Sequence, residues 1–98
     1  MDPLLNVVLR HQIYLEGLKG GRNAEFVKMI AQLDKALREQ LAFVDYNNLS
    51  DASRTSINKL ILTLKKTAMK IADAWLYELI RWLQEYVAAD TDFWQFAY

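Results

Sequence analysis

One side chain of this sequence titrates near neutral pH, and it is His11. A histidine can act as a general base or bind a metal ion, and both roles need acidic or histidine partners within reach. On a helix, such partners would appear as Glu-x-x-His or His-x-x-x-His, and neither spacing occurs here. We therefore expect His11 to be a hydrogen-bonded histidine at a helix interface and not a ligand.

Other residues that could do chemistry are missing or are not brought together. The chain has no cysteine, and the segment GLKGG at 17–21 lacks the Lys-Ser/Thr ending of a phosphate-binding loop. Asp90 and Asp92 lie close together at a predicted helix end, where carboxylates are normally solvated. The sequence therefore predicts a protein that is not an enzyme and that uses no metal and no cofactor.

Basic residues gather in the segment 54–70, which holds five Lys or Arg and no acidic residue. Such a stripe can contact the phosphates of a nucleic acid. A solvated helix face, partly paired with acids of neighbouring chains, is the competing interpretation, because the aromatic residues that would stack on bases lie in a different segment. A nucleic acid is therefore the alternative partner, with these candidate phosphate contacts: Lys59, Lys65, Lys66 and Lys70.

Helices must position these side chains, since no stretch alternates apolar and polar residues as a strand does. Asp2 followed by Pro3 suits a helix start. After the turn DYNNL at 45–49, Ser50 is a good cap for a second helix. All three glycines fall between 17 and 21, and Asn23 could cap a restart after them.

The predicted fold class is all-α. The main prediction is a long antiparallel helical hairpin of about 3–44 and 50–89, followed by an aromatic C-terminal tail. Whether the first helix runs on through Gly20-Gly21 or bends there is left open. The alternative is a compact three-helix bundle, in which residues 3–19 fold back at the glycines.

The hydrophobic pattern differs between the two ends of this hairpin. Residues 26–44 and 57–71 each carry one apolar stripe that a single neighbouring helix can cover. Residues 75–87, WLYELIRWLQEYV, spread their apolar side chains over about 160° of the helix, which indicates two neighbours. The second neighbour is either the tail folded back or, as we favour, another copy or another protein. The predicted partner interface combines the apolar residues of this end: Leu5, Leu9, Ile13, Tyr14, Trp75, Leu76, Leu79, Ile80, Trp82, Leu83, Tyr86, Val87, Phe93, Trp94 and Phe96.

Length and composition set further bounds. The 98 residues, 53% of them hydrophobic, predict a single helical domain over 1–98, either complete or the N-terminal part of a longer chain. Twelve basic and twelve acidic residues cancel, so no global charge recruits a nucleic acid or an anionic membrane. The start resembles no signal peptide, and four charges within 71–89 argue against a transmembrane span. A membrane-active role of 71–98 is a third hypothesis, although the polar face of 71–89 is net acidic.

The stretch RHQIYLEGLKGGRNAEFVKMIAQLDKALREQL, at 10–41, resembles the opening of some internal or minor head proteins of tailed bacteriophages. The resemblance lies in an Arg-His-Gln-x-Tyr-Leu start and in a later Leu-Asp-x-x-Leu-Arg segment at 33–38. It implies a helical virion component, present in several copies and held against the portal or the head interior. With the absence of cysteine, it implies an intracellular, reducing location or the interior of a virion. The expected function is thus an assembly module that self-associates or docks on a larger complex.

Overall fold

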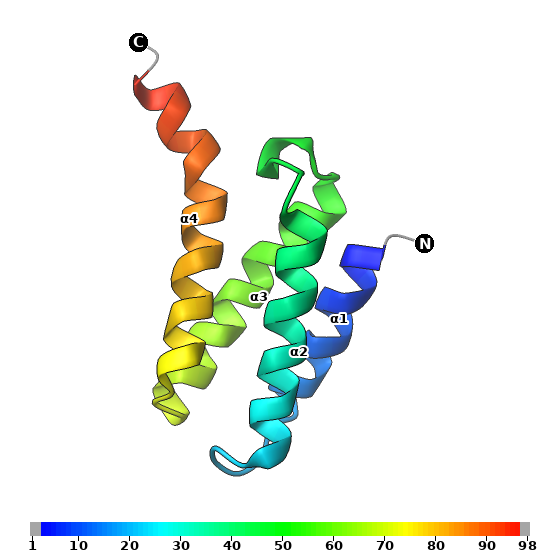
Figure 1. The fold of residues 1–98 in the computed structure, drawn as a ribbon, viewed down its shortest axis with the longest axis vertical. Helices are drawn as coiled ribbons and strands as arrows, with labels where there is room; N and C mark the ends of the chain where they lie inside the picture. The colour runs from blue at the N-terminus through cyan, green and yellow to red at the C-terminus, as the bar shows by residue number, and fades with distance from the viewer. Residues whose placement is uncertain (1–2, 97–98) are drawn as a thin grey trace.

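The computed structural model describes the backbone of residues 3–96 and the side chains of residues 3–89 (Figure 1). This part of the chain forms four α-helices and one short 3₁₀ helix, without a strand. In chain order they are α1 (Pro3–Glu16), α2 (Ala24–Leu41), η1 (Tyr46–Asn48), α3 (Asp51–Lys70) and α4 (Ala74–Phe96). The predicted all-α fold class is confirmed.

The long two-helix hairpin is not formed, because both of its arms are interrupted. The first arm breaks between α1 and α2, and the second breaks between α3 and α4. The chain does turn back at the glycines, as in the three-helix alternative, but it builds four helices instead of three.

The break between α1 and α2 follows from two residues. Gly20 has a φ of 102°, in the left-handed region that side-chain-bearing residues avoid. Asn23 then caps α2, since its side-chain oxygen accepts a hydrogen bond from the backbone N–H of Phe26 at 2.8 Å. The sequence predicts this cap, and the structure confirms it.

The break between α3 and α4 contains neither glycine nor proline, so the sequence predicts one continuous helix here, and this prediction is wrong. Ile71 adopts an extended backbone, which ends α3. Asp73 then starts α4, because its Oδ1 accepts a hydrogen bond from the backbone N–H of Leu76 at 3.0 Å. The other oxygen, Oδ2, accepts from Arg22 Nε at 2.5 Å. This ion pair ties the α1–α2 loop to the α3–α4 turn at one end of the bundle.

The core lies where the four helices meet. Leu60 and Leu64 of α3 are fully buried, as are Leu33 and Leu37 of α2. Each such side chain contributes roughly 1.5–3 kcal/mol by leaving water. In Figure 1, α1 and α4 lie on opposite sides of α2 and α3. The α1 members and the α4 members of the predicted partner interface are therefore not neighbours in space.

Candidate functional site

The apolar side chains of α4 mostly face the interior of the chain. Leu76, Leu79 and Leu83 are fully buried, and Ile80 is 7% exposed. The three leucines, all members of the predicted partner interface, fill the core and cannot contact a partner in this fold. The segment 75–87 does have two neighbours, as the wide angular spread of its apolar side chains indicates. Both neighbours belong to the same chain.

Contacts with α2 and with the turn after it cover the second side of α4. The guanidinium carbon of Arg38 lies 4.7 Å from the ring centre of Trp82, in a cation–π arrangement. The Tyr86 hydroxyl donates a hydrogen bond to the carbonyl of Val44, and its ring meets that of Tyr46 edge to face. Trp82 and Tyr86 are thus half-buried anchors inside the molecule.

The remaining members of the predicted interface are divided between separate surfaces. On α1, Leu9 and Ile13 are 48% and 72% exposed, whereas Leu5 and Tyr14 are half-buried. Trp75, at the start of α4, is 40% exposed. Phe93, Trp94 and Phe96 lie outside the described side chains.

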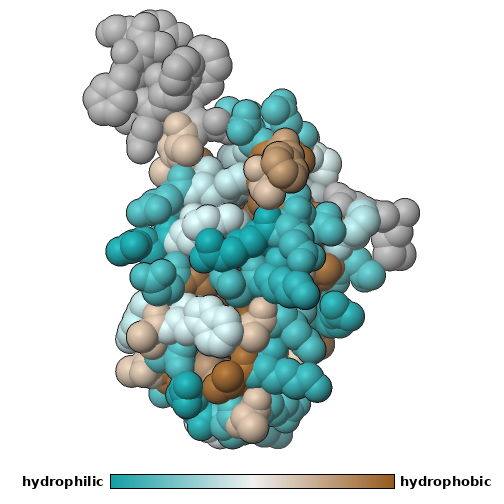
Figure 2. All heavy atoms as spheres, viewed as in Figure 1, coloured by the Kyte–Doolittle hydropathy of each residue, from teal (hydrophilic) through white to brown (hydrophobic). Residues whose placement is uncertain are grey.

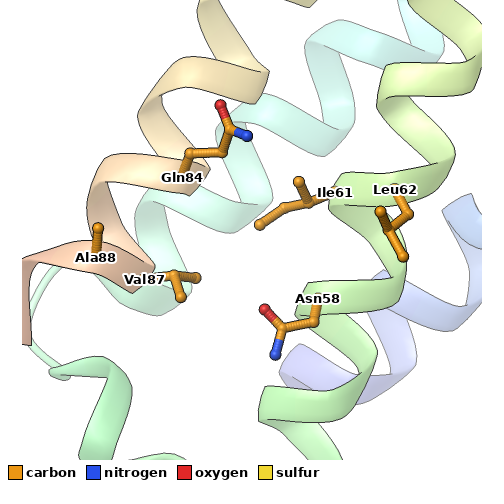
Figure 3. A pocket seen from close by; sticks show the side chains of 6 residues that line it. All are labelled: Asn58, Ile61, Leu62, Gln84, Val87 and Ala88. Atoms are coloured by element: carbon orange, nitrogen blue, oxygen red, sulfur yellow. The ribbon is translucent and has the colours of Figure 1, made fainter. Parts of the chain in front are cut away.

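A further apolar surface is exposed in the groove between α3 and α4, and two members of the predicted interface, Ile80 and Val87, line it. Figure 3 shows its open end, where side chains of the two helices face each other across a hollow of about 330 Å³. The lining is apolar apart from two amides: Asn58, Ile61, Leu62, Gln84, Val87 and Ala88. We call this hollow and its continuation toward the turn the α3/α4 groove.

The continuation of the groove is a second hollow of about 210 Å³, lined by Lys65, Ala68, Met69, Tyr77 and Ile80. Three large side chains along the groove are strongly exposed: Leu62 by 60%, Met69 by 87% and Tyr77 by 51%. By contrast, Figure 2 shows a face over α2 that is covered mainly by hydrophilic residues. The α3/α4 groove is therefore the best candidate binding surface among the described residues.

Comparisons with protein-family models, with curated proteins and with solved structures find no match. The candidate site therefore stands on its geometry alone. Within residues 3–96, no helix is both long and apolar enough to cross a membrane.

The basic stripe of the sequence is divided by the fold. Lys65 lines the α3/α4 groove. Lys66 and Lys70 instead line a hollow between α3 and α1, and Lys59 Nζ lies 3.9 Å from the Glu16 carboxylate on that same side. The candidate phosphate contacts therefore do not form one continuous stripe, because α3 presents Lys65 on a different side from the other three.

His11 is buried, with 2% of its surface exposed. Its Nδ1 donates a hydrogen bond to the backbone carbonyl of Val7 at 2.9 Å, and its Nε2 has no partner among the described residues. Burial lowers the pKa of His11 below its ordinary value of 6.5. No group of three metal-binding side chains occurs in the part of the chain that the structure describes. His11 is thus placed as a packing residue of α1.

Sequence reasoning missed the exposed residues of the groove. Leu62 and Met69 lie seven residues apart on α3, which places them on one side of the helix and outside its buried stripe. This spacing indicates a second apolar position on α3, but two residues give a weaker pattern than the dense segment 75–87. Tyr77 was missed because its neighbours in that segment are more hydrophobic.

Proposed function

We propose that this protein is a non-enzymatic helical assembly module, which self-associates or docks on a larger complex. The observation that supports the proposal is the α3/α4 groove, with Leu62, Met69 and Tyr77 exposed along it. Large apolar side chains that line one groove are seldom left in contact with water, and a partner that covers them gains their burial.

Light scattering on the purified chain, across a concentration series, tests the proposal. We expect particles larger than the monomer at high micromolar concentration. The variant Leu62→Glu with Met69→Glu should shift the distribution toward monomer, because it places two charges in the groove. Gln32→Glu with Gln40→Glu is the matched control, since it adds the same charge at exposed positions of α2. A monomer at every concentration, with no bound partner, would count against the proposal.

The resemblance of residues 10–41 supports a further part of the proposal, that the assembly is a virion component at the portal or the head interior of a tailed bacteriophage. Residues that carry the resemblance have structural roles in α1 and α2: His11, Leu15, Leu33 and Leu37 are buried, and Arg38 pairs with Asp34 at 2.9 Å. They would maintain a shared fold, with the partner surface elsewhere. Portal or capsid genes beside the coding gene are the expected observation, and a neighbourhood of unrelated metabolic genes would contradict it.

A nucleic acid is the second candidate partner, and the exposed amines of Lys59, Lys66 and Lys70 on one side of α3 favour it. Binding through three phosphate contacts would weaken steeply with salt, because each contact releases a counterion. Fluorescence titration of a labelled duplex at low and at moderate salt measures this slope. No binding at low salt, or an affinity independent of salt, would exclude this candidate.

A further inference from the structure

The α3/α4 groove has flanks of opposite charge. On the α3 flank, Lys65 lines the groove, and Lys59 and Lys66 are exposed at the outer edge of α3, where they also border α1. On the α4 flank, the carboxylates of Glu78 and Glu85 are 64% and 70% exposed, and each lies 3.8 Å from Arg81. These are exposed ion pairs without a direct hydrogen bond, so both carboxylates can also interact with a second cation.

The charged residues of the two flanks occupy symmetric positions about the turn. Lys66 lies six residues before Ala72, and Glu78 lies six residues after it. Lys59 and Glu85 lie thirteen residues before and after the same alanine. At 1.5 Å per helical residue, the members of each couple lie at matching distances from the helix ends at the turn, about 6 Å and about 17 Å.

We infer that the occupant of the groove is a second copy of this chain, bound through a twofold axis that runs between α3 and α4 and along their length. This inference rests on the proposed function and names its partner. A twofold interface must be complementary to itself, and a face with basic and acidic flanks at matching heights meets that requirement.

The direction of the axis follows from the charges. Rotation about an axis along the groove places α3 of each copy over α4 of the other, so that Lys66 and Lys59 meet Glu78 and Glu85 of the partner copy. An axis across the groove would instead place lysines against lysines and carboxylates against carboxylates. The first arrangement attracts and the second repels.

The divergence of the helices fits the same axis. Figure 1 shows α3 and α4 moving apart from the turn at 71–73. Rotation about the line midway between them exchanges the two arms of this V, so α3 of the partner runs along α4 over its length. The exposed Leu62, Met69 and Tyr77 of both copies then lie within the interface, and the hollow in Figure 3 is covered.

Charge exchange between two variants tests the arrangement. Lys66→Glu alone and Glu78→Lys alone should each raise the dissociation constant of the dimer about tenfold, because two attractive contacts become repulsive. An equimolar mixture of the two variants should recover dimer, since every facing couple is then of opposite sign. Analytical ultracentrifugation of the full chain measures each constant, and circular dichroism confirms that each variant is folded.

The matched control is the mixture of Lys35→Glu with Glu39→Lys, which carries the same net charges at exposed positions of α2. We expect no change in the dissociation constant from either change or from their mixture. A dimer that is indifferent to Lys66→Glu, Glu78→Lys and their mixture would overturn the inference while leaving the proposed function standing. A wild-type chain that remains monomeric at high micromolar concentration would overturn the inference together with the self-association that the proposed function includes.

Discussion

Two sets of apolar residues on neighbouring helices have opposite roles. Leu76, Leu79 and Leu83 of α4 belong to the most hydrophobic segment of the sequence and are fully buried. Leu62 and Met69 of α3 stand among lysines and are strongly exposed. The density of apolar residues in a segment therefore indicates how many neighbours it has. It does not tell whether those neighbours belong to the same chain or to a partner.

The largest expected effect is on the free energy of unfolding, which should differ between substitutions in the two sets. Leu83→Ala should lower the free energy of unfolding by about 2–5 kcal/mol, since it opens a cavity in the core. Leu62→Ala should lower it by about 0.5 kcal/mol or less, because that side chain is mostly in water. Urea unfolding at a protein concentration low enough to keep the chain monomeric measures both. Equal losses would contradict the division between core and groove.

The α3–α4 turn holds the buried set in place, so its cap should have the next largest effect. Asp73→Ala should cost about 1–2 kcal/mol through the lost cap of α4, and the half-exposed Arg22 adds little to that. The hydrogen bond from Arg22 holds the pKa of Asp73 below its ordinary value of 3.8.

The stabilisation that Asp73 provides should decrease as the pH falls. Because the folded pKa of Asp73 is the lower one, its contribution is present above about pH 3.8 and is lost as the pH falls through the folded pKa. Urea unfolding at about pH 6 and at about pH 3 should show a larger acid loss in the wild type than in Asp73→Ala. An identical acid loss in both proteins would refute this role.

His11 should have a smaller effect, which concerns the free energy of unfolding and not the dissociation constant of the dimer. Burial, together with the nearby charge of Arg10, lowers the pKa of His11 in the folded chain. The unfolded chain therefore binds more protons below pH 6.5, and stability should decrease from about pH 7.5 to about pH 5. His11→Gln should flatten this slope, measured by urea unfolding at the two pH values. A change in the dissociation constant of the dimer in His11→Gln would place α1 in the interface.

The smallest expected effect concerns the exposed surface of α1. Ile13 is 72% exposed and belongs to the predicted partner interface, but α1 lies on the opposite side of the bundle from α4. Ile13→Ser should therefore change both the free energy of unfolding and the dimer constant by less than about 0.5 kcal/mol. A clear loss of dimer, measured by ultracentrifugation, would move the interface from the α3/α4 groove to α1.

Local capping chemistry made much of the fold predictable from the sequence. Ser50 caps α3 by accepting from the backbone N–H of Ser53 at 3.2 Å, and Asn23 caps α2, both as predicted. Asp73 was not recognised, because an aspartate inside a long hydrophobic run without glycine or proline reads equally well as a solvated helix charge. Its second oxygen accepts a hydrogen bond from Arg22, which lies 51 residues away in the chain, so this partner is not visible in the local sequence.

The candidate site was harder to predict for a related reason. A helical wheel gives the direction of each side chain on its own helix, but it does not tell which other helices cover that direction. The apolar side of α4 met α2 only because the second arm of the hairpin breaks at 71–73. The same break leaves Leu62 and Met69 beside an open groove.

The reactivity of single cysteines tests the central claim most directly, because the natural chain has no cysteine to interfere. Leu62→Cys should react rapidly with a thiol reagent in dilute solution and more slowly as the protein concentration rises. Leu83→Cys should react slowly at every concentration, and Ile13→Cys should react rapidly at every concentration. Reaction of Leu83→Cys as fast as that of Leu62→Cys in the folded chain would contradict the account.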